Sequence, residues 1–146
     1  MIKKFENFNN TPPKIYLAGG WSGWRDIVIK YFPGVNFLDP RKVGGGPDSN
    51  KINWFNEETR MINESDGTIA WVVKDNKSGF GMTFEMGMTY GLNKPYVLIN
   101  EKEDKYQWGM QSSGADFTAD SYKDVFNWIV KTNWLGLKLY YNNEKF

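Results

Sequence analysis

Three short stretches of this chain are apolar at every position, and this pattern most limits how the chain can fold. They lie at 15–18, 69–73 and 97–99. A strand with one face in water alternates between apolar and polar side chains, so continuous apolar runs are typical of strands buried on both faces of a parallel sheet. Stretches with helical spacing separate these runs. The sequence therefore predicts an α/β fold with helices on both faces of a parallel sheet.

The order of the elements follows from these patterns and from the Gly- and Pro-rich segments between them. We expect strands at 14–18, 35–38, 68–73, 95–99 and 115–118, and helices at 27–32, 54–62, 81–93 and 121–130. Ser121 is the expected N-cap of the last helix. No repeat or long linker divides residues 1–146, so we expect one domain. It has a polar arm at 1–13 and an aromatic tail at 135–146 that packs on the body or on a partner.

The charges of the chain nearly balance, with 18 Lys and Arg residues, 17 Asp and Glu residues, and a net charge of +1. This balance gives no support to a nucleic-acid polymer or a membrane surface as an electrostatic partner. The first ten residues lack the apolar stretch of a signal peptide, and the longest apolar runs are far too short to span a bilayer. We expect a cytoplasmic protein.

The chain contains no Cys and no His. This composition excludes disulfides, thiol nucleophiles, Ser–His triads and the usual zinc sites. No aspartate-rich metal loop is present either, so we expect neither a metal nor a cofactor. Catalysis at neutral pH must then depend on carboxylates, Tyr or Lys.

Glu85 is the only charged residue between Lys77 and Lys94, and its neighbours are Met, Phe, Thr, Tyr and Gly. Carboxylates are rarely buried without a partner, and desolvation raises the pKa of a carboxyl group. Two interpretations are open. Glu85 is a nucleophile towards an electrophilic carbon, such as the anomeric carbon of a sugar, or it satisfies free amides at a helix N-terminus.

Ligands of a parallel α/β sheet bind beyond the carboxyl ends of the strands. Here those ends are followed by the segments 19–26, 39–46, 74–85 and 100–108. Tyr16 ends the first strand, where its hydroxyl can reach a carboxylate, or it is simply a core aromatic. Trp21 and Trp24 either form the wall of a pocket for a flat ring or plug the crevice.

Four further polar side chains are candidates for the same crevice, each with a simpler alternative. Asp39 and Arg41 fit the donor and acceptor edge of a base, or they form a turn with Arg41 in solvent. Glu58 either points into the crevice or lies solvated on its helix. Ser78 is placed to bind a sugar hydroxyl, or it is an ordinary loop residue.

Together these residues resemble the nucleoside 2-deoxyribosyltransferase family, which includes the deoxynucleoside 5'-monophosphate glycosidases. The segment 15–21 resembles the first strand and loop of the family, whose Tyr contacts the nucleophilic Glu and whose Trp lines the base pocket. The segment 81–95 resembles the helix that carries the nucleophile, and this places the nucleophile on Glu85. The resemblance covers about residues 14–130 and implies a flavodoxin-like fold with roughly five parallel strands.

The resemblance also implies roles for other positions. Glu58 lies where transferases carry an Asp near the base, and Arg41 lies where some members use a base-reading Gln. Gly79, next to Ser78, lies six residues before the nucleophile, where some transferases carry Asp and the monophosphate glycosidases carry Ser. Asp104 lies where a neighbouring subunit donates an Asn to the sugar 5' end in some members. An acidic side chain there favours a free nucleoside over a 5'-phosphate.

The expected activity is cleavage of the N-glycosidic bond of a 2'-deoxyribonucleoside, through a covalent deoxyribosyl-Glu85 intermediate. Tyr16 orients Glu85, and Glu58 or Asp39 assists protonation of the departing base. The deoxyribose then passes to a second nucleobase or to water. The alternatives are an N-glycosidase for a 5'-nucleotide or NAD, and a nucleotide sensor without catalytic activity. The resemblance implies a homo-oligomer, based on dimers and reaching up to a hexamer, with sites completed across subunits.

Overall fold

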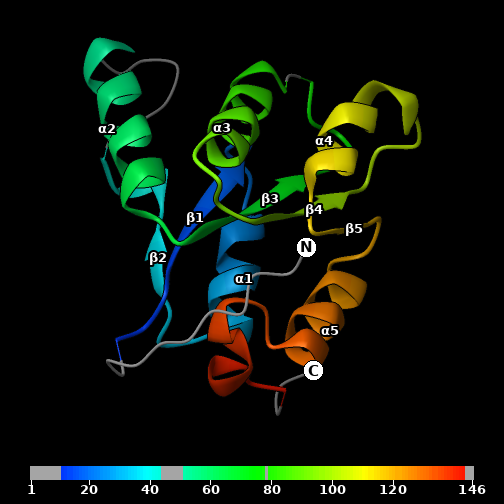
Figure 1. The fold of residues 1–146 in the computed structure, drawn as a ribbon. Helices are drawn as coiled ribbons and strands as arrows, with labels where there is room; N and C mark the ends of the chain where they lie inside the picture. Colours follow the sequence, from blue (N-terminus) through cyan, green and yellow to red (C-terminus); the bar gives the residue numbers. More distant parts are fainter. Residues whose placement is uncertain (1–10, 44–50, 78, 144–146) are drawn as a thin grey trace.

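A five-stranded parallel sheet forms the centre of the molecule (Figure 1). The computed structural model describes residues 11–43, 51–77 and 79–143. The strands are β1 (Lys14–Gly19), β2 (Asn36–Leu38), β3 (Gly67–Val72), β4 (Tyr96–Asn100) and β5 (Phe117–Ala119). Their order is β2-β1-β3-β4-β5, and each neighbouring pair is parallel. This order is that of the flavodoxin-like fold, whose ligands bind at the switch between β1 and β3.

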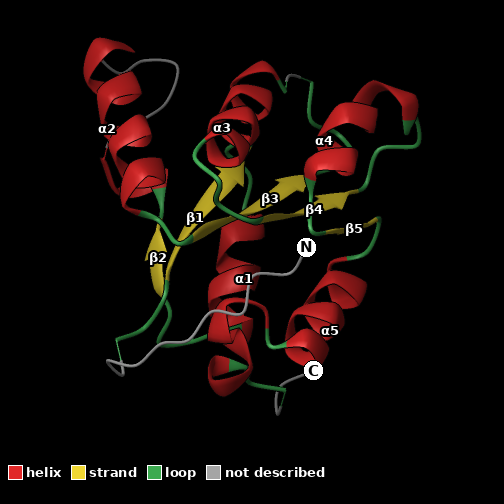
Figure 2. Ribbon diagram, viewed as in Figure 1, coloured by secondary structure: helices red, strands yellow, loops and turns green. Residues whose placement is uncertain are grey.

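Helices cover both faces of the sheet (Figure 2). α1 (Trp24–Tyr31) and α5 (Tyr122–Thr132) cover one face, and α2 (Lys51–Glu64), α3 (Phe80–Gly91) and α4 (Gly109–Gly114) cover the other. Short 3₁₀-helical segments are η1 (Pro40–Val43), η2 (Tyr106–Trp108) and η3 (Trp134–Tyr140). In the part of the chain described here, no helix has the length and apolar character needed to cross a bilayer.

Side chains of β1 point alternately to the two faces of the sheet, and this divides the core into two parts. Ile15 and Leu17 belong to the core that includes α1 and α5, whereas Tyr16 and Ala18 belong to the core that includes α2 and α3. All of β3 is buried, as its continuous apolar sequence predicts. Tyr16 therefore lies on the face from which α2 and α3 approach.

The predicted elements are present, with three differences in detail. The last strand begins at Phe117, which pairs with Val97, because Ala115 still closes α4. Ser121 occupies the N-cap position of α5, but its side chain makes no capping hydrogen bond, so that expectation is wrong. The sequence analysis did not predict α4, which has Gly at both ends and no buried residue.

The aromatic tail packs on the body of the molecule, which was one of the two expectations for it. Leu135 and Leu137 are buried in the core that includes α1 and α5. The Tyr141 ring stacks on Tyr31, with 6.2 Å between the ring centroids, and also contacts Phe32. Most of the predicted polar arm, residues 1–10, and the chain end, residues 144–146, lie outside the described residues.

Gly67 begins β3 at a place with no room for a side chain. A Cβ there would lie 2.5 Å from Leu135 Cδ1 and 2.8 Å from the backbone oxygen of Pro95, which cannot move aside. We predict that Gly67→Ala lowers the free energy of unfolding by about 1–3 kcal/mol, measured by urea denaturation, because it overpacks the core.

Gly87→Ala is the matched control, because a Cβ at this position of α3 meets no atom within 4 Å. It should leave the free energy of unfolding unchanged or raise it by up to about 1 kcal/mol, since Ala favours helix over Gly. Equal stabilities of the two variants would contradict the packing described at Gly67.

Candidate active site

A cavity of about 330 Å³ opens between α2 and α3. Apolar and aromatic side chains surround two carboxylates in its lining, which consists of Trp54, Phe55, Glu58, Thr59, Ile62, Gly81, Phe84 and Glu85. The volume is at the lower end of the range for small-molecule sites, and the combination of apolar walls with a few polar groups is typical of them. Glu58 and Glu85 thus approach one apolar space from two different helices.

A larger cavity of about 570 Å³ lies on the other flank of α3, against α4. No acidic or basic side chain is among its lining residues, which are Thr83, Met86, Gly87, Tyr90, Tyr96, Gly109, Met110, Gln111, Ser113 and Gly114. Without a carboxylate, this cavity lacks the groups needed for carboxylate chemistry. The smaller cavity is therefore the candidate active site.

Glu85 lies beyond the first turn of α3, which starts at Phe80 and carries no acidic residue. The free amides of a helix N-terminus belong to its first turn. The interpretation of Glu85 as a residue that satisfies these amides is therefore wrong. Glu85 Oε2 is shielded from solvent and has no hydrogen-bond partner among the described residues.

The environment of Glu85 raises the pKa of its carboxyl group to about 8. Burial is the largest cause and the charge of Glu58 adds to it, whereas Arg25 and Tyr16 act in the opposite direction. The carboxylate that forms on deprotonation is poorly solvated, and such a group is a competent nucleophile.

Tyr16 is fully buried, and its hydroxyl also has no hydrogen-bond partner within the part of the chain that the structure describes. Burial raises the pKa of Tyr16 well above its ordinary value, and the charges of Glu85 and Glu58 raise it further. The phenol therefore keeps its proton. Tyr16 and Glu85 interact strongly enough for each to change the pKa of the other, although no hydrogen bond of ordinary geometry joins them.

Glu58 is buried on α2, with 8% of its surface exposed, so the interpretation of a solvated helix residue is wrong. Burial raises the pKa of Glu58, while the Trp54 indole and the charge of Arg25 oppose that rise. A carboxyl group with a raised pKa holds its proton closer to neutral pH, as a general acid must. Glu58 is therefore the better-placed acid of the two candidates named from the sequence.

Three polar atoms around the cavity are buried without a hydrogen-bond partner in the described residues. They are Tyr16 Oη, Trp54 Nε1 and Glu85 Oε2. Buried polar atoms are nearly always paired in proteins, and exceptions cluster where a ligand binds. The three atoms come from β1, α2 and α3, and they offer a polar ligand both donors and acceptors.

The two predicted pocket tryptophans occupy different environments. Trp21 is 44% exposed, whereas Trp24 is buried in the core against Trp71, with 5.7 Å between the ring centroids. Trp24 Nε1 donates a hydrogen bond to the Gly20 oxygen at 3.0 Å. Neither ring lines the cavity between α2 and α3. Trp24 packs beneath the loop, and Trp21 remains available at the surface.

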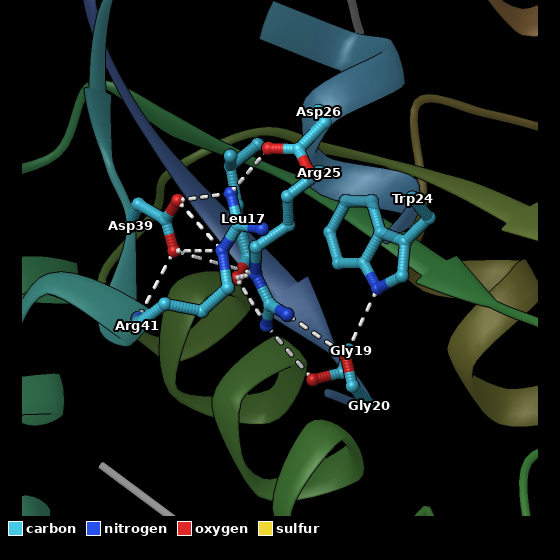
Figure 3. A network of polar contacts seen from close by, with 8 residues as sticks. All are labelled: Leu17, Gly19, Gly20, Trp24, Arg25, Asp26, Asp39 and Arg41. Atoms are coloured by element: carbon cyan, nitrogen blue, oxygen red, sulfur yellow. Dashed lines mark hydrogen bonds and ion pairs between the residues drawn. The ribbon is translucent and has the colours of Figure 1, made fainter. Parts of the chain in front are cut away.

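Asp39 and Arg41 form an ion pair with each other (Figure 3). Arg41 Nη2 lies 2.7 Å from Asp39 Oδ2 and 2.9 Å from Asp26 Oδ1. Burial raises the pKa of Asp39, but the hydrogen bonds from Arg41 outweigh burial and hold that pKa below its ordinary value. Asp39 is therefore a poor proton donor, and Arg41 is not the free cation that the turn interpretation described.

The remaining predicted site residues lie near the start of α3 and after β4. Gly79 directly precedes α3, and a Cβ there would lie 2.5 Å from the Trp108 ring. Asp104 is exposed, and its Oδ1 accepts a hydrogen bond from the Tyr106 backbone at 3.1 Å. Ser78 lies outside the described residues.

Several residues of the site were missed in the sequence analysis. Phe55 and Phe84 face each other across α2 and α3, with 5.9 Å between the ring centroids, and both are more than half exposed. Trp54 lies four residues before Glu58, so helical spacing gave a signal for that pair. No pattern in the sequence pointed to Arg25, which acts on both carboxyl groups.

Two carboxyl groups with raised pKa values and a protonated phenol make the site suited to nucleophilic and acid–base catalysis. Within the described residues, no group of three or more acidic side chains is arranged to hold a metal ion.

Comparison with known proteins agrees with this arrangement. The family model for nucleoside 2-deoxyribosyltransferases matches residues 28–129. No curated protein matches the chain, but nine chains of solved structure do. One is the 2-deoxyribosyltransferase of the psychrotolerant bacterium Bacillus psychrosaccharolyticus, with a TM-score of 0.64 and 21% sequence identity, over 78% of this chain and 90% of that chain. That structure shares the fold, and the family model spans most of the present chain, so this chain belongs to the nucleoside 2-deoxyribosyltransferase family.

Proposed function

We propose that this protein cleaves the N-glycosidic bond of 2'-deoxyribonucleosides through a covalent deoxyribosyl-Glu85 intermediate and passes the sugar to another nucleobase. Family membership supports deoxyribosyl transfer in general. The observation that carries the finer proposal is the pair of carboxyl groups, Glu85 and Glu58, that faces one apolar cavity from two helices.

In the first step, a Glu85 carboxylate oxygen attacks C1' and the bond from C1' to the base nitrogen breaks. The bonding electrons leave with the base, which takes a proton from Glu58. In the second step, a nitrogen of the incoming base attacks C1', its proton passes to Glu58, and Glu85 leaves as a carboxylate. Two displacements at C1' retain the configuration of the sugar. Tyr16 orients Glu85 by donating its phenolic proton to the carboxylate in the loaded site.

Glu58 is assigned the acid role in preference to Asp39. Burial and the absence of a strong cationic partner raise the pKa of Glu58, whereas the hydrogen bonds from Arg41 hold the pKa of Asp39 below its ordinary value. Asp39 and Arg41 remain proposed as base-recognition residues, together with Trp21. Asp104, Gly79 and Ser78 remain proposed for the sugar end.

We predict that Glu85→Gln lowers base release at least about 1,000-fold, because the amide is neutral and not nucleophilic. Chromatography of free base is the measurement, with deoxyadenosine, deoxyadenosine monophosphate and NAD supplied separately. Release from deoxyadenosine by the intact protein supports the nucleoside assignment. Release from the monophosphate or from NAD alone would support the N-glycosidase alternative. Tight binding without any release would support a sensor.

A second prediction concerns the leaving group. Glu58→Gln should slow release of adenine by about 100- to 10,000-fold, the usual contribution of a general acid. It should slow release of an activated base that departs without protonation, such as a nitro-substituted heterocycle, less than about tenfold. Initial rates for the two substrates give the comparison, and equal losses would remove Glu58 from the acid role.

A third prediction uses the pH dependence of stability. The pKa of Glu85 is about 8 in the folded protein and is near 4.5, its ordinary value, when the chain unfolds. Between these values the folded state holds a proton that the unfolded state has lost, so stability falls as pH rises. Glu85→Gln should match the wild type below about pH 4.5 and exceed it by about 2–4 kcal/mol above pH 8. Urea denaturation across this range tests this, and a stability difference independent of pH would contradict it.

The proposed oligomer needs an apolar surface, and α3 with the η2–α4 segment provides one. Phe80, Tyr90, Tyr106 and Met110 are all more than 60% exposed. Large apolar side chains gathered on one side of a protein are typical of an association surface. We therefore expect sedimentation velocity to show a dimer or larger species, and a monomer at every concentration would contradict this expectation.

A further inference from the structure

Arg25 is a buried cation at the start of α1, with 1% of its surface exposed, and its guanidinium grips the end of β1 (Figure 3). Nη1 donates a hydrogen bond to the Gly20 oxygen at 2.7 Å, and Nη2 donates to the Gly19 oxygen at 2.8 Å. Nε and Nη2 both donate to the Leu17 oxygen, at 3.3 and 3.1 Å. One side chain therefore ties three carbonyl groups of a single turn, as only the planar fork of Arg can do.

This turn connects two residues assigned to the site. Tyr16 directly precedes it and Trp21 directly follows it. The Arg25 guanidinium carbon lies 4.5 Å from the Trp24 ring centroid and 5.5 Å from the Trp21 ring centroid, within the range of cation–π contacts. Arg25 thus fixes both the end of β1 and the loop that continues from it.

The charge of Arg25 is shared with a carboxylate that another cation already binds. Arg25 Nε lies 3.8 Å from Asp39 Oδ1, whereas Arg41 lies 2.7 Å from Asp39 Oδ2. The positive charge of Arg25 is therefore incompletely neutralised by Asp39, and its field extends to Tyr16 and Glu85.

The groups that act on Glu85 come from every element around it: Tyr16 of β1, Glu58 of α2 and Arg25 of α1. Glu58 opposes ionisation of Glu85. Arg25 is the cation in this set, and it favours ionisation.

We propose that Arg25 is a positioning residue of this active site: it fixes the turn at 17–20 between Tyr16 and Trp21 and supplies the positive charge that favours the ionised Glu85. Its meaning for catalysis rests on the proposed function. The positioning and the charge are properties of the protein itself, and they are measurable without a substrate.

The first test is a titration of the Glu85 carboxyl group by carbon-13 NMR without substrate, with the signal assigned by its loss in Glu85→Gln. In Arg25→Met the pKa of Glu85 should rise by about one unit, because a nearby cation is lost. In Arg25→Lys it should stay near the wild-type value. The matched control is Arg60→Met, since Arg60 pairs with Glu57 and Glu64 on the exposed side of α2. A folded Arg25→Met with an unchanged titration would overturn the electrostatic part of the proposal.

The second test isolates positioning and also works if Arg25→Met does not fold. Arg25→Lys keeps the charge but loses the fork, so the turn should shift. The indole NMR signal of Trp24 should then move, because its Nε1 donates to the Gly20 oxygen. An unmoved Trp24 signal in Arg25→Lys would overturn the positioning part.

Base release separates this proposal from the proposed function. If the wild type cleaves deoxynucleosides, Arg25→Lys should lower kcat at least about tenfold, since small displacements of catalytic groups are costly. Wild-type rates in a folded Arg25→Lys would contradict a positioning role. If the wild type releases no base, the proposed function fails, and the two NMR measurements still decide whether Arg25 fixes the turn and favours the ionised Glu85.

Discussion

The alternation of side chains along β1 is the constraint on which the rest of the structure depends. Ile15 and Leu17 close the core with α1 and α5, so Tyr16 must point to the opposite face, towards α2 and α3. A shift of one residue in register would exchange the two faces and remove the phenol from the site. The same placement brings Tyr16 close to Glu85, where burial raises the pKa of the carboxyl group to about 8. The site therefore combines reactivity with a cost in stability, as expected for a desolvated carboxylate.

Much of the fold and the central pair of the site were predictable because they depend on local periodicity. Continuous apolar runs identified the buried strands, and the isolated charge at Glu85 marked the reactive carboxyl group. The end of the first strand indicated Tyr16 by the general rule for ligand sites in parallel sheets. α4 was not predictable in this way, since six residues with Gly at both ends and no buried side chain carry no apolar period.

The remaining features depend on contacts between distant parts of the chain. The cavity forms only where α2 approaches α3, so its aromatic walls, Phe55 and Phe84, had no joint signal in the sequence. Asp39 and Glu58 looked equally suitable as acids, and the ion pair with Arg41 separates them. Arg25 resembled any solvated residue at a helix start, because its burial and its hydrogen bonds to the end of β1 exist only in the folded chain.

The central claim is that Glu85 carries the sugar between the two half-reactions. Its most direct test is mass spectrometry of the intact protein, quenched with acid after incubation with deoxyadenosine in the absence of an acceptor base. The account predicts a single deoxyribosyl adduct that maps to the peptide containing Glu85 and disappears faster when an acceptor base is added than in water alone. Release of adenine without an adduct, or an adduct that maps to another residue, would contradict it.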